Sequence, residues 1–244
     1  MSHKLLPLLA ALLPFACQST GSSSASPTDA QAQEASAERP LHVGFLMIDG
    51  VYNTELTAPF DILQHTIFHT KPGMRTFTVS PSSAVVTTFE GLKLVPDYTF
   101  ANAPEIDVLI VPSAEHNMDT DLEDERLITW VRETGEKADW IMSLCDGAFI
   151  LAQAGLLDGK KATTFPSDIA RMREMFSDRI DILDGVTFVH DGKAITSVGG
   201  AQSFEPALYL CEVLYGKKVT RGIGRGLVID WDLAQLETHI VGQP

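Results

Sequence analysis

The segment Ser143 to Phe149 places a cysteine where it could act as a nucleophile. An apolar run, Trp140 to Met142, precedes this segment, and a helical pattern of small residues begins at Ala148. This order predicts a strand, a sharp turn that carries Cys145, and then a helix, which is the arrangement of a nucleophile elbow. Such a turn exposes the thiol and sets it at a helix N-terminus, where N–H groups favour a thiolate. The alternative is a buried structural cysteine in an ordinary strand–helix turn.

The other two cysteines lack such a context. Cys211 follows an apolar pattern at helical spacing, together with Phe204, Leu208 and Tyr215, which predicts a core residue. Cys17 ends an apolar segment near the N-terminus. No Cys-x-x-Cys pair occurs and the seven histidines are scattered, so we expect no disulfide framework, metal site or cofactor.

The N-terminal residues are expected to be an export segment and a spacer. Residues 1–17 combine a basic start with an apolar run that is too short to span a bilayer, which predicts a signal peptide. The run ends at Cys17 as in bacterial lipoprotein signals, in which the cysteine is lipidated, although Pro14 departs from that pattern. Secretion without a lipid is the alternative. Residues 18–40 predict a flexible linker. From the export segment we expect a periplasmic or cell-envelope protein that contacts the membrane only through a lipid anchor.

Residues 41–244 are expected to form one domain of the α/β class. Strand-like segments at 41–48, 75–80, 106–111 and 140–144 alternate with helical patterns. This alternation predicts a three-layer sandwich, flavodoxin-like, in which helices cover both faces of a mostly parallel central sheet. The formal net charge of −14 weighs against a nucleic-acid partner. The candidate nucleophile instead points to a small molecule as the expected partner.

Two helix boundaries can also be predicted from the sequence. Thr120 and Glu123 have the spacing of a capping box, which predicts a helix that runs to about Glu136. Ser203 is expected to cap the last long helix, which should stop at Gly216.

Loops at the carboxyl ends of the strands supply further candidate site residues, because ligands of such sheets bind there. Backbone N–H groups of Ser113, Ala114 and Asp146 are expected to stabilise an oxyanion. His116 is the histidine nearest to a predicted site loop, and a surface position is its alternative role. Gly200 is expected to border the pocket or simply to form a turn.

Four segments resemble the DJ-1/PfpI superfamily, whose fold is related to that of class I glutamine amidotransferases. They are residues 45–63, 106–112, 141–165 and 193–210. The third is the most specific, because Cys-x-Gly-Ala is followed by Ala-Gly-Leu-Leu-Asp-Gly-Lys.

This resemblance has implications for the site and the assembly. It implies that Cys145 is the family's reactive cysteine, that Glu55 is the carboxyl in contact with it, and that the chain forms a homodimer. A protonated Glu55 that donates to sulfur would lower the pKa of the thiol. Without the resemblance, a solvated residue in the first turn of a helix is the simpler interpretation of Glu55.

Several departures from the family pattern limit the expected chemistry. Pro112-Ser113-Ala114 replaces Pro-Gly-Gly, and relatives that resemble isonitrile hydratases carry Thr after the cysteine. Asp146 and Phe165 fill the two positions where relatives carry a histidine base, which weighs against a Cys–His peptidase or amidotransferase. We therefore expect Cys145 to act on a small electrophile by hydrolysis or hydration, in an isonitrile hydratase-like or amidase-like reaction. The alternative is a non-catalytic domain at the cell envelope that binds a small molecule or senses oxidation.

Overall fold

The computed structural model describes residues 39–241. The expected signal peptide, Cys17 and nearly all of the expected linker lie outside the described residues. Among residues 39–241, no helix combines the length and the apolar character needed to cross a membrane.

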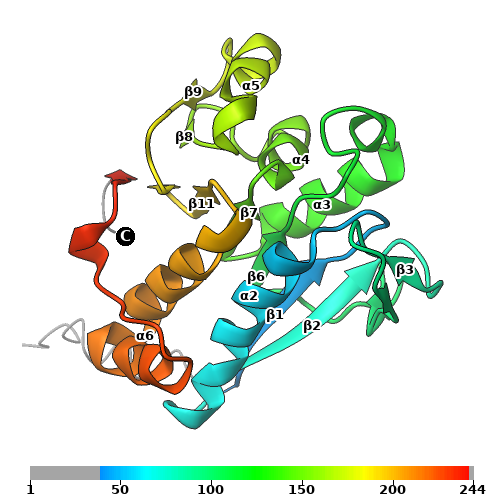
Figure 1. Cartoon of the computed structure of the whole chain (residues 1–244). Coiled ribbons are helices and arrows are strands. Elements are labelled where there is room, and N and C mark those ends of the chain that lie inside the picture. The colour runs from blue at the N-terminus through cyan, green and yellow to red at the C-terminus, as the bar shows by residue number, and fades with distance from the viewer. Residues whose placement is uncertain (1–38, 242–244) are drawn as a thin grey trace, which may run out of the picture. The chain divides into compact units, whose positions relative to one another are not determined.

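The centre of the domain is an eight-stranded sheet with the strand order β12-β10-β11-β7-β6-β1-β2-β5 (Figure 1). Its strands are β1 (Leu41–Leu46), β2 (Met74–Ser80), β5 (Tyr98–Thr99), β6 (Val108–Val111), β7 (Trp140–Leu144), β10 (Phe188–Asp191), β11 (Ala194–Ser197) and β12 (Thr238–Val241). Only β10 and β11 pair antiparallel within this sheet. The mostly parallel sheet predicted from the sequence is therefore confirmed.

Two small sheets lie outside the central one. The antiparallel pair of β3 (Val86–Thr87) and β4 (Lys93–Leu94) forms a hairpin, and β8 (Lys161–Ala162) pairs in parallel with β9 (Asp181–Ile182).

Helices cover both faces of the central sheet, as the sequence predicts. Figure 1 shows α2 and α6 side by side in front of the sheet, with α3 behind it. The α-helices are α2 (Asn53–Gln64), α3 (Glu125–Lys137), α4 (Gly147–Gln153), α5 (Ile169–Phe176) and α6 (Phe204–Gly226). The short 3-10 helices are η1 (His65–Phe68), η2 (Thr120–Glu123), η3 (Pro166–Asp168), η4 (Gly200–Gln202) and η5 (Leu233–Gln235).

The predicted start of one helix at Thr120 is wrong, whereas the predicted break at Gly216 is present, although the helix resumes after it. Residues 120–123 form η2, and α3 begins only after Asp124, whose carboxylate accepts from the Arg126 and Leu127 N–H groups at 2.9 and 3.1 Å. A neighbouring Asp thus caps the helix in place of Thr120. In α6 the chain breaks at Gly216, with φ of 78°, and then resumes a helical path to Gly226.

The hydrophobic core lies between the sheet and its helices. Every residue of β6 is buried, and the side chains of Phe45 and Phe149 are fully enclosed. Cys211 is 0% exposed in α6, which confirms the predicted core position, and burial raises the pKa of its thiol to about 12. This cysteine therefore has the environment of an inert packing residue.

A buried histidine ties the sheet to α6. The ring of His190 lies 2.8 Å from the Gly192 carbonyl through Nε2 and 2.8 Å from the Tyr209 hydroxyl through Nδ1. A carbonyl can only accept, so Nε2 carries the proton and Nδ1 accepts from Tyr209. Burial lowers the pKa of His190. The structure therefore stabilises the neutral ring.

We expect the neutral His190 to make the fold sensitive to mild acid. The pKa of His190 is lower in the folded protein than in the unfolded chain, where it is about 6.5. The contribution of the neutral ring to the free energy of unfolding is therefore complete above about pH 6.5 and is lost as the pH falls through the folded-state pKa. Urea unfolding at pH 7.5 and 5.0 should show a larger loss of unfolding free energy for the wild type than for His190→Asn. Each unit by which the pKa is lowered corresponds to about 1.4 kcal/mol. Equal losses in both proteins would contradict the assignment.

Candidate active site

The predicted nucleophile elbow is present at the carboxyl end of β7. Leu144 ends the strand, Cys145 adopts φ of 53°, and α4 begins at Gly147. A positive φ is unusual for a residue with a side chain and stores strain that the surroundings must hold. The Cys145 N–H donates to the Ser197 carbonyl at 3.0 Å, which anchors the turn to β11.

Two glycines allow the chain to pack closely around this turn. A Cβ at Gly147 would clash with the Val111 carbonyl of β6, and one at Gly199 would clash with the backbone and Cβ of Cys145. Gly199 also has φ of 72° and ψ of −151°, a conformation open almost only to glycine. The elbow therefore depends on residues from three neighbouring strand ends.

Replacing Gly199 with alanine should displace Cys145 and lower the free energy of unfolding by about 3 kcal/mol, because steric overlap adds to backbone strain. Gly159→Ala is the matched control, since Gly159 also has φ of 72° but nothing lies within 4 Å of its added Cβ. Strain alone should cost the control about 1 kcal/mol. Equal thermal stability of the two variants would contradict the steric overlap expected between a Cβ at position 199 and Cys145.

The thiol of Cys145 is enclosed and surrounded by acids. The residue is 8% exposed. Burial raises the pKa of the thiol, and the charges of Glu55 and Asp146 raise it further, while the Ser113 hydroxyl and the Asp146 N–H act in the opposite direction. The shift is opposite to the one expected for an elbow cysteine, because burial and two carboxylates outweigh the donors. The resting site therefore holds a thiol and not a thiolate.

Glu55 lies in the first turn of α2 and is only 4% exposed, which excludes the solvated position. Its Oε2 accepts from the Ser113 N–H at 3.1 Å and from the Ser113 hydroxyl at 2.5 Å. Its Oε1 accepts from the Gly200 N–H at 3.0 Å. The carboxylate thus joins α2, the loop after β6 and η4. Glu55 and the Ser113 hydroxyl both affect the pKa of the Cys145 thiol, which the carboxylate raises and the hydroxyl lowers.

Two of the three expected oxyanion donors, the N–H groups of Ser113 and Ala114, already donate to side chains, and so does the N–H group of Gly200. Glu55 takes the N–H groups of Ser113 and Gly200, and the Asn117 side chain accepts from the Ala114 N–H at 2.8 Å. The Asp146 N–H is directed at the sulfur. The structure thus differs from the expected oxyanion pocket, because side chains satisfy most of its donors.

Asp146 lies directly after the nucleophile and is partly buried. Its Oδ1 accepts from the Thr164 hydroxyl at 3.0 Å, and the same hydroxyl lies 3.1 Å from the Cys145 carbonyl oxygen. Burial, followed by the charge of Asp168, raises the pKa of Asp146 to about 6.

His116 does not join this group of residues. Its side chain is 53% exposed, and its Nδ1 lies 3.4 Å from the Asp119 carboxylate. It lines a different cleft together with Asp49 and Asp121. This placement corresponds to the surface role that the sequence left open.

The sequence analysis missed three residues of the site. Tyr52 has a raised pKa because of burial and the nearby Cys145 and Asp146, and its ring stacks on Phe89 with centroids 4.6 Å apart. Asn117 and Thr164 bind the backbone and carboxyl groups described above. Tyr52 could have been noted because it lies in the loop after β1, three residues before Glu55. The two polar residues give no such signal, since only the fold brings them to their partners.

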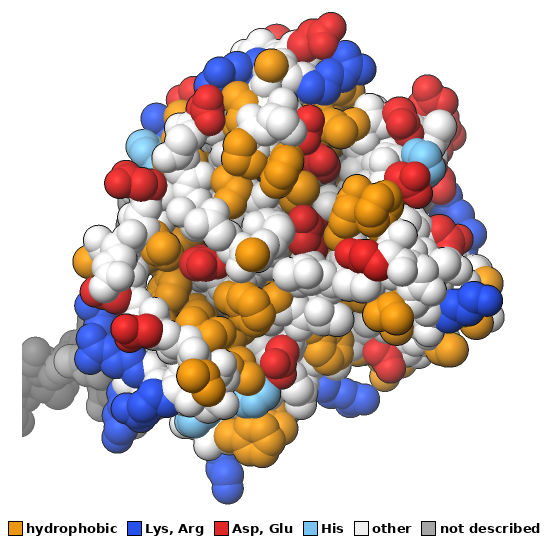
Figure 2. Space-filling view, in the orientation of Figure 1, with side chains coloured by type: hydrophobic (Ala, Val, Ile, Leu, Met, Phe, Trp, Pro, Cys, Tyr) orange, Lys and Arg blue, Asp and Glu red, His pale blue; other side chains and the backbone are white. Residues whose placement is uncertain are grey.

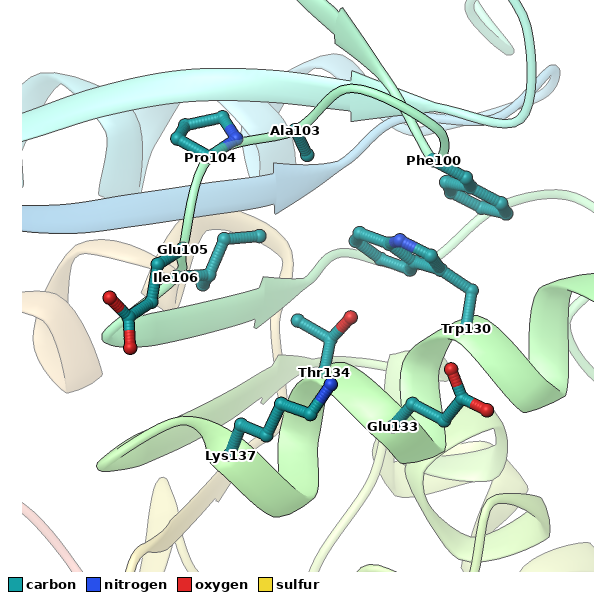
Figure 3. A pocket seen from close by; sticks show the side chains of 9 residues that line it. All are labelled: Phe100, Ala103, Pro104, Glu105, Ile106, Trp130, Glu133, Thr134 and Lys137. Carbon is teal, nitrogen blue, oxygen red and sulfur yellow. The ribbon is translucent and has the colours of Figure 1, made fainter.

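The face of the molecule seen in Figure 2 has few cations near its centre. Figure 2 shows acidic and apolar side chains in the centre of the viewed face, with Lys and Arg nearer to its margins. A cleft of about 380 Å³ lies elsewhere, between α3 and residues 100–106, and the stacked rings of Phe100 and Trp130 form one wall of it (Figure 3). Its lining includes neither Cys145 nor Glu55. Among residues 39–241, no three His, Cys, Asp or Glu side chains are grouped so as to hold a metal ion.

Comparison with known proteins identifies relatives of the whole domain. The DJ-1/PfpI family profile matches residues 42–212. An isonitrile hydratase of Pseudomonas putida is 31% identical over 180 residues, which are 72% of this chain and 73% of that protein. The transcriptional regulator GbdR of Pseudomonas aeruginosa, of HTH type, is 25% identical over 192 residues, which are 78% of this chain but only 51% of the regulator.

Solved structures agree with the fold. Drosophila melanogaster DJ-1beta superposes with a TM-score of 0.68 at 21% identity and covers 79% of this chain and 100% of its own. An AraC family transcriptional regulator from Pseudomonas putida superposes with a TM-score of 0.68 at 23% identity, covering 77% of this chain and 100% of its own. At such identities these structures show the fold alone. With the family profile extending over most of the described residues, the chain belongs to the DJ-1/PfpI family.

Proposed function

We propose that the protein is a cysteine-dependent enzyme in which Cys145 attacks a small, uncharged electrophile that water then hydrolyses or hydrates. The observation that carries this proposal is the strained elbow thiol beside the buried Glu55–Ser113 pair. Strain of this kind persists where surrounding contacts enforce it, and it concentrates at functional sites. The 31% identity with an isonitrile hydratase supports an isonitrile-like substrate within this class.

The reaction must begin from a protonated thiol, because burial and nearby acids raise its pKa. With an isonitrile, sulfur would bond to the terminal carbon, and that carbon would gain the thiol proton to give a thioimidate. Water would then add to the same carbon, nitrogen would take a proton, and sulfur would leave as the thiol. The product would be an N-substituted formamide. The Asp146 N–H is placed to stabilise charge that develops near sulfur.

The charges around the thiol favour an uncharged substrate. Glu55 and Asp146 raise the pKa of Cys145, and Asp168 raises that of Asp146. An anionic substrate would meet the same repulsion as a thiolate. A panel of isonitriles, nitriles, amides and matched carboxylate-bearing analogues tests this directly. Product should form from uncharged members, and turnover confined to the carboxylate-bearing members would overturn the proposal.

A second candidate is a non-catalytic domain that binds a small ligand. The raised pKa of Cys145 and the 25% identity with a transcriptional regulator favour it. Ligand-induced thermal stabilisation without turnover of any electrophile would support this candidate. Export through residues 1–17, a lipid on Cys17 and a homodimer are likewise proposals, and they rest on the sequence.

A further inference from the structure

We propose that Asp146 exchanges the thiol proton of Cys145 during the reaction, and that the Thr164 hydroxyl holds the Asp146 carboxyl in place for this transfer. The inference deepens the proposed function and rests on it for the role in turnover. Asp146 would then be a catalytic acid/base, whereas Thr164 and Glu55 would be positioning residues.

Glu55 is poorly suited to take the proton. Both of its oxygens already accept hydrogen bonds, two from Ser113 and one from Gly200. A proton on Glu55 would compete with one of these donors and would loosen either the loop after β6 or η4. The donors thus fix Glu55 as an acceptor that organises the site.

Asp146 has an unusual position for its residue type. It is the N-cap residue of α4, yet its side chain makes no capping hydrogen bond to the helix. Aspartate at this position ordinarily accepts from the helix N–H groups. Here the carboxyl turns to Thr164, which is 0% exposed. The Asp146 carboxyl therefore makes no capping hydrogen bond to α4 and instead stays beside Cys145.

Thr164 can satisfy both protonation states of Asp146. When Asp146 is ionised, the Thr164 hydroxyl donates to its Oδ1 at 3.0 Å. When Asp146 is protonated, its O–H can donate to Thr164, whose own proton is then free for the Cys145 carbonyl oxygen at 3.1 Å. The carboxyl can therefore gain and lose a proton without leaving a buried group unpaired.

The groups that face Asp146 place its titration near neutral pH. Burial and the charges of Asp168 and Glu55 raise its pKa to about 6, whereas hydrogen bonds from Thr164 and the Cys145 thiol lower it. Tyr52 also faces this group and has a raised pKa of its own. An acid/base with a pKa near the working pH transfers protons efficiently in both directions.

The proton transfer balances within the proposed reaction. As the bond from sulfur to the substrate carbon forms, the S–H bond breaks and the proton moves to Asp146. The protonated carboxyl then gives this proton to the substrate atom that has become basic, which is the same carbon in the isonitrile case. Asp146 returns to its ionised form before water adds.

Alkylation of Cys145 by iodoacetamide tests the inference without any substrate. In the full chain, peptide mass spectrometry can follow Cys145 separately from Cys17 and Cys211 between pH 4.5 and 10. The wild-type rate should rise in a step near pH 6, where Asp146 ionises and can accept the thiol proton, and should rise again in alkali. Asp146→Asn should lack the step, and its alkaline rise should start at lower pH because a repelling charge is gone.

Matched variants separate proton exchange from a structural effect. Thr164→Val should move the step to higher pH, and Thr164→Ser should return it toward the wild-type position. Asp168→Asn should keep the step but move it to lower pH. Identical profiles for the wild type and Asp146→Asn would overturn the inference. If the wild type turns over a substrate, Asp146→Asn should lower kcat about 10²-fold; if it turns over none, the proposed function fails while the alkylation profile still decides on proton exchange.

Discussion

Replacing Cys145 with serine is expected to abolish turnover of any accepted electrophile, with a loss of at least about 10⁴-fold in kcat/KM. Serine fits the same space at the elbow, so the strained φ of 53° and the bond to Ser197 should survive. Its hydroxyl is a far weaker nucleophile than sulfur and holds its proton more tightly, and the acids that raise the thiol pKa would oppose its ionisation further.

Cys211→Ala is the control for this variant. Cys211 is fully buried in α6, so its replacement should lower stability but leave kcat/KM near the wild-type value. Full turnover by Cys145→Ser would remove Cys145 from the chemistry and leave ligand binding as the better account of the site.

Replacing Glu55 with glutamine should have the next largest effect, and it should act on three observables. One end of the amide would present N–H groups to the N–H donors of Ser113 or Gly200, which leaves buried donors unpaired and costs about 2 kcal/mol of stability. Turnover should fall about 10²-fold as the loop after β6 loses its anchor. The apparent pKa of Cys145 should fall, because the variant lacks a charge that raises it.

The change in the thiol pKa caused by Glu55→Gln, a rise or a fall, shows whether Glu55 donates to sulfur or accepts from its neighbours. A protonated Glu55 that donated to sulfur would make the pKa rise in the variant, whereas an ionised Glu55 held by Ser113 and Gly200 makes it fall. Glu115→Gln is the matched control, since Glu115 is an exposed acid of the same neighbourhood and should leave both stability and thiol pKa nearly unchanged. A rise in Glu55→Gln would contradict the geometry described above.

The fold and the elbow were predictable because they rest on local patterns. Continuous apolar runs such as Val108–Val111 predict buried parallel strands, and the order of strand, Cys145 and small-residue helix predicts the turn. Helix ends were less predictable, because Asp124 and Thr120 offer competing caps within one short segment.

The electrostatics of the site could not be predicted in the same way. The bond from Gly200 to Glu55 joins residues 145 positions apart, and that from Thr164 to Asp146 joins residues 18 positions apart. Sequence spacing alone therefore could not predict that the N–H groups of Ser113 and Gly200 donate to Glu55. It also gave the wrong direction for the Cys145 pKa, because that direction depends on how deeply three-dimensional packing buries the thiol and two carboxyls.

The central claim is that Cys145 performs the reaction, and progressive alkylation tests it most directly. Protein samples with increasing fractions of alkylated Cys145, measured by peptide mass spectrometry, would be assayed against an isonitrile or another electrophile accepted from the panel. We predict that residual turnover falls in proportion to unmodified Cys145 and reaches zero when alkylation is complete. Turnover that persists in fully alkylated protein would contradict the claim, as would the absence of turnover from unmodified protein across the whole panel.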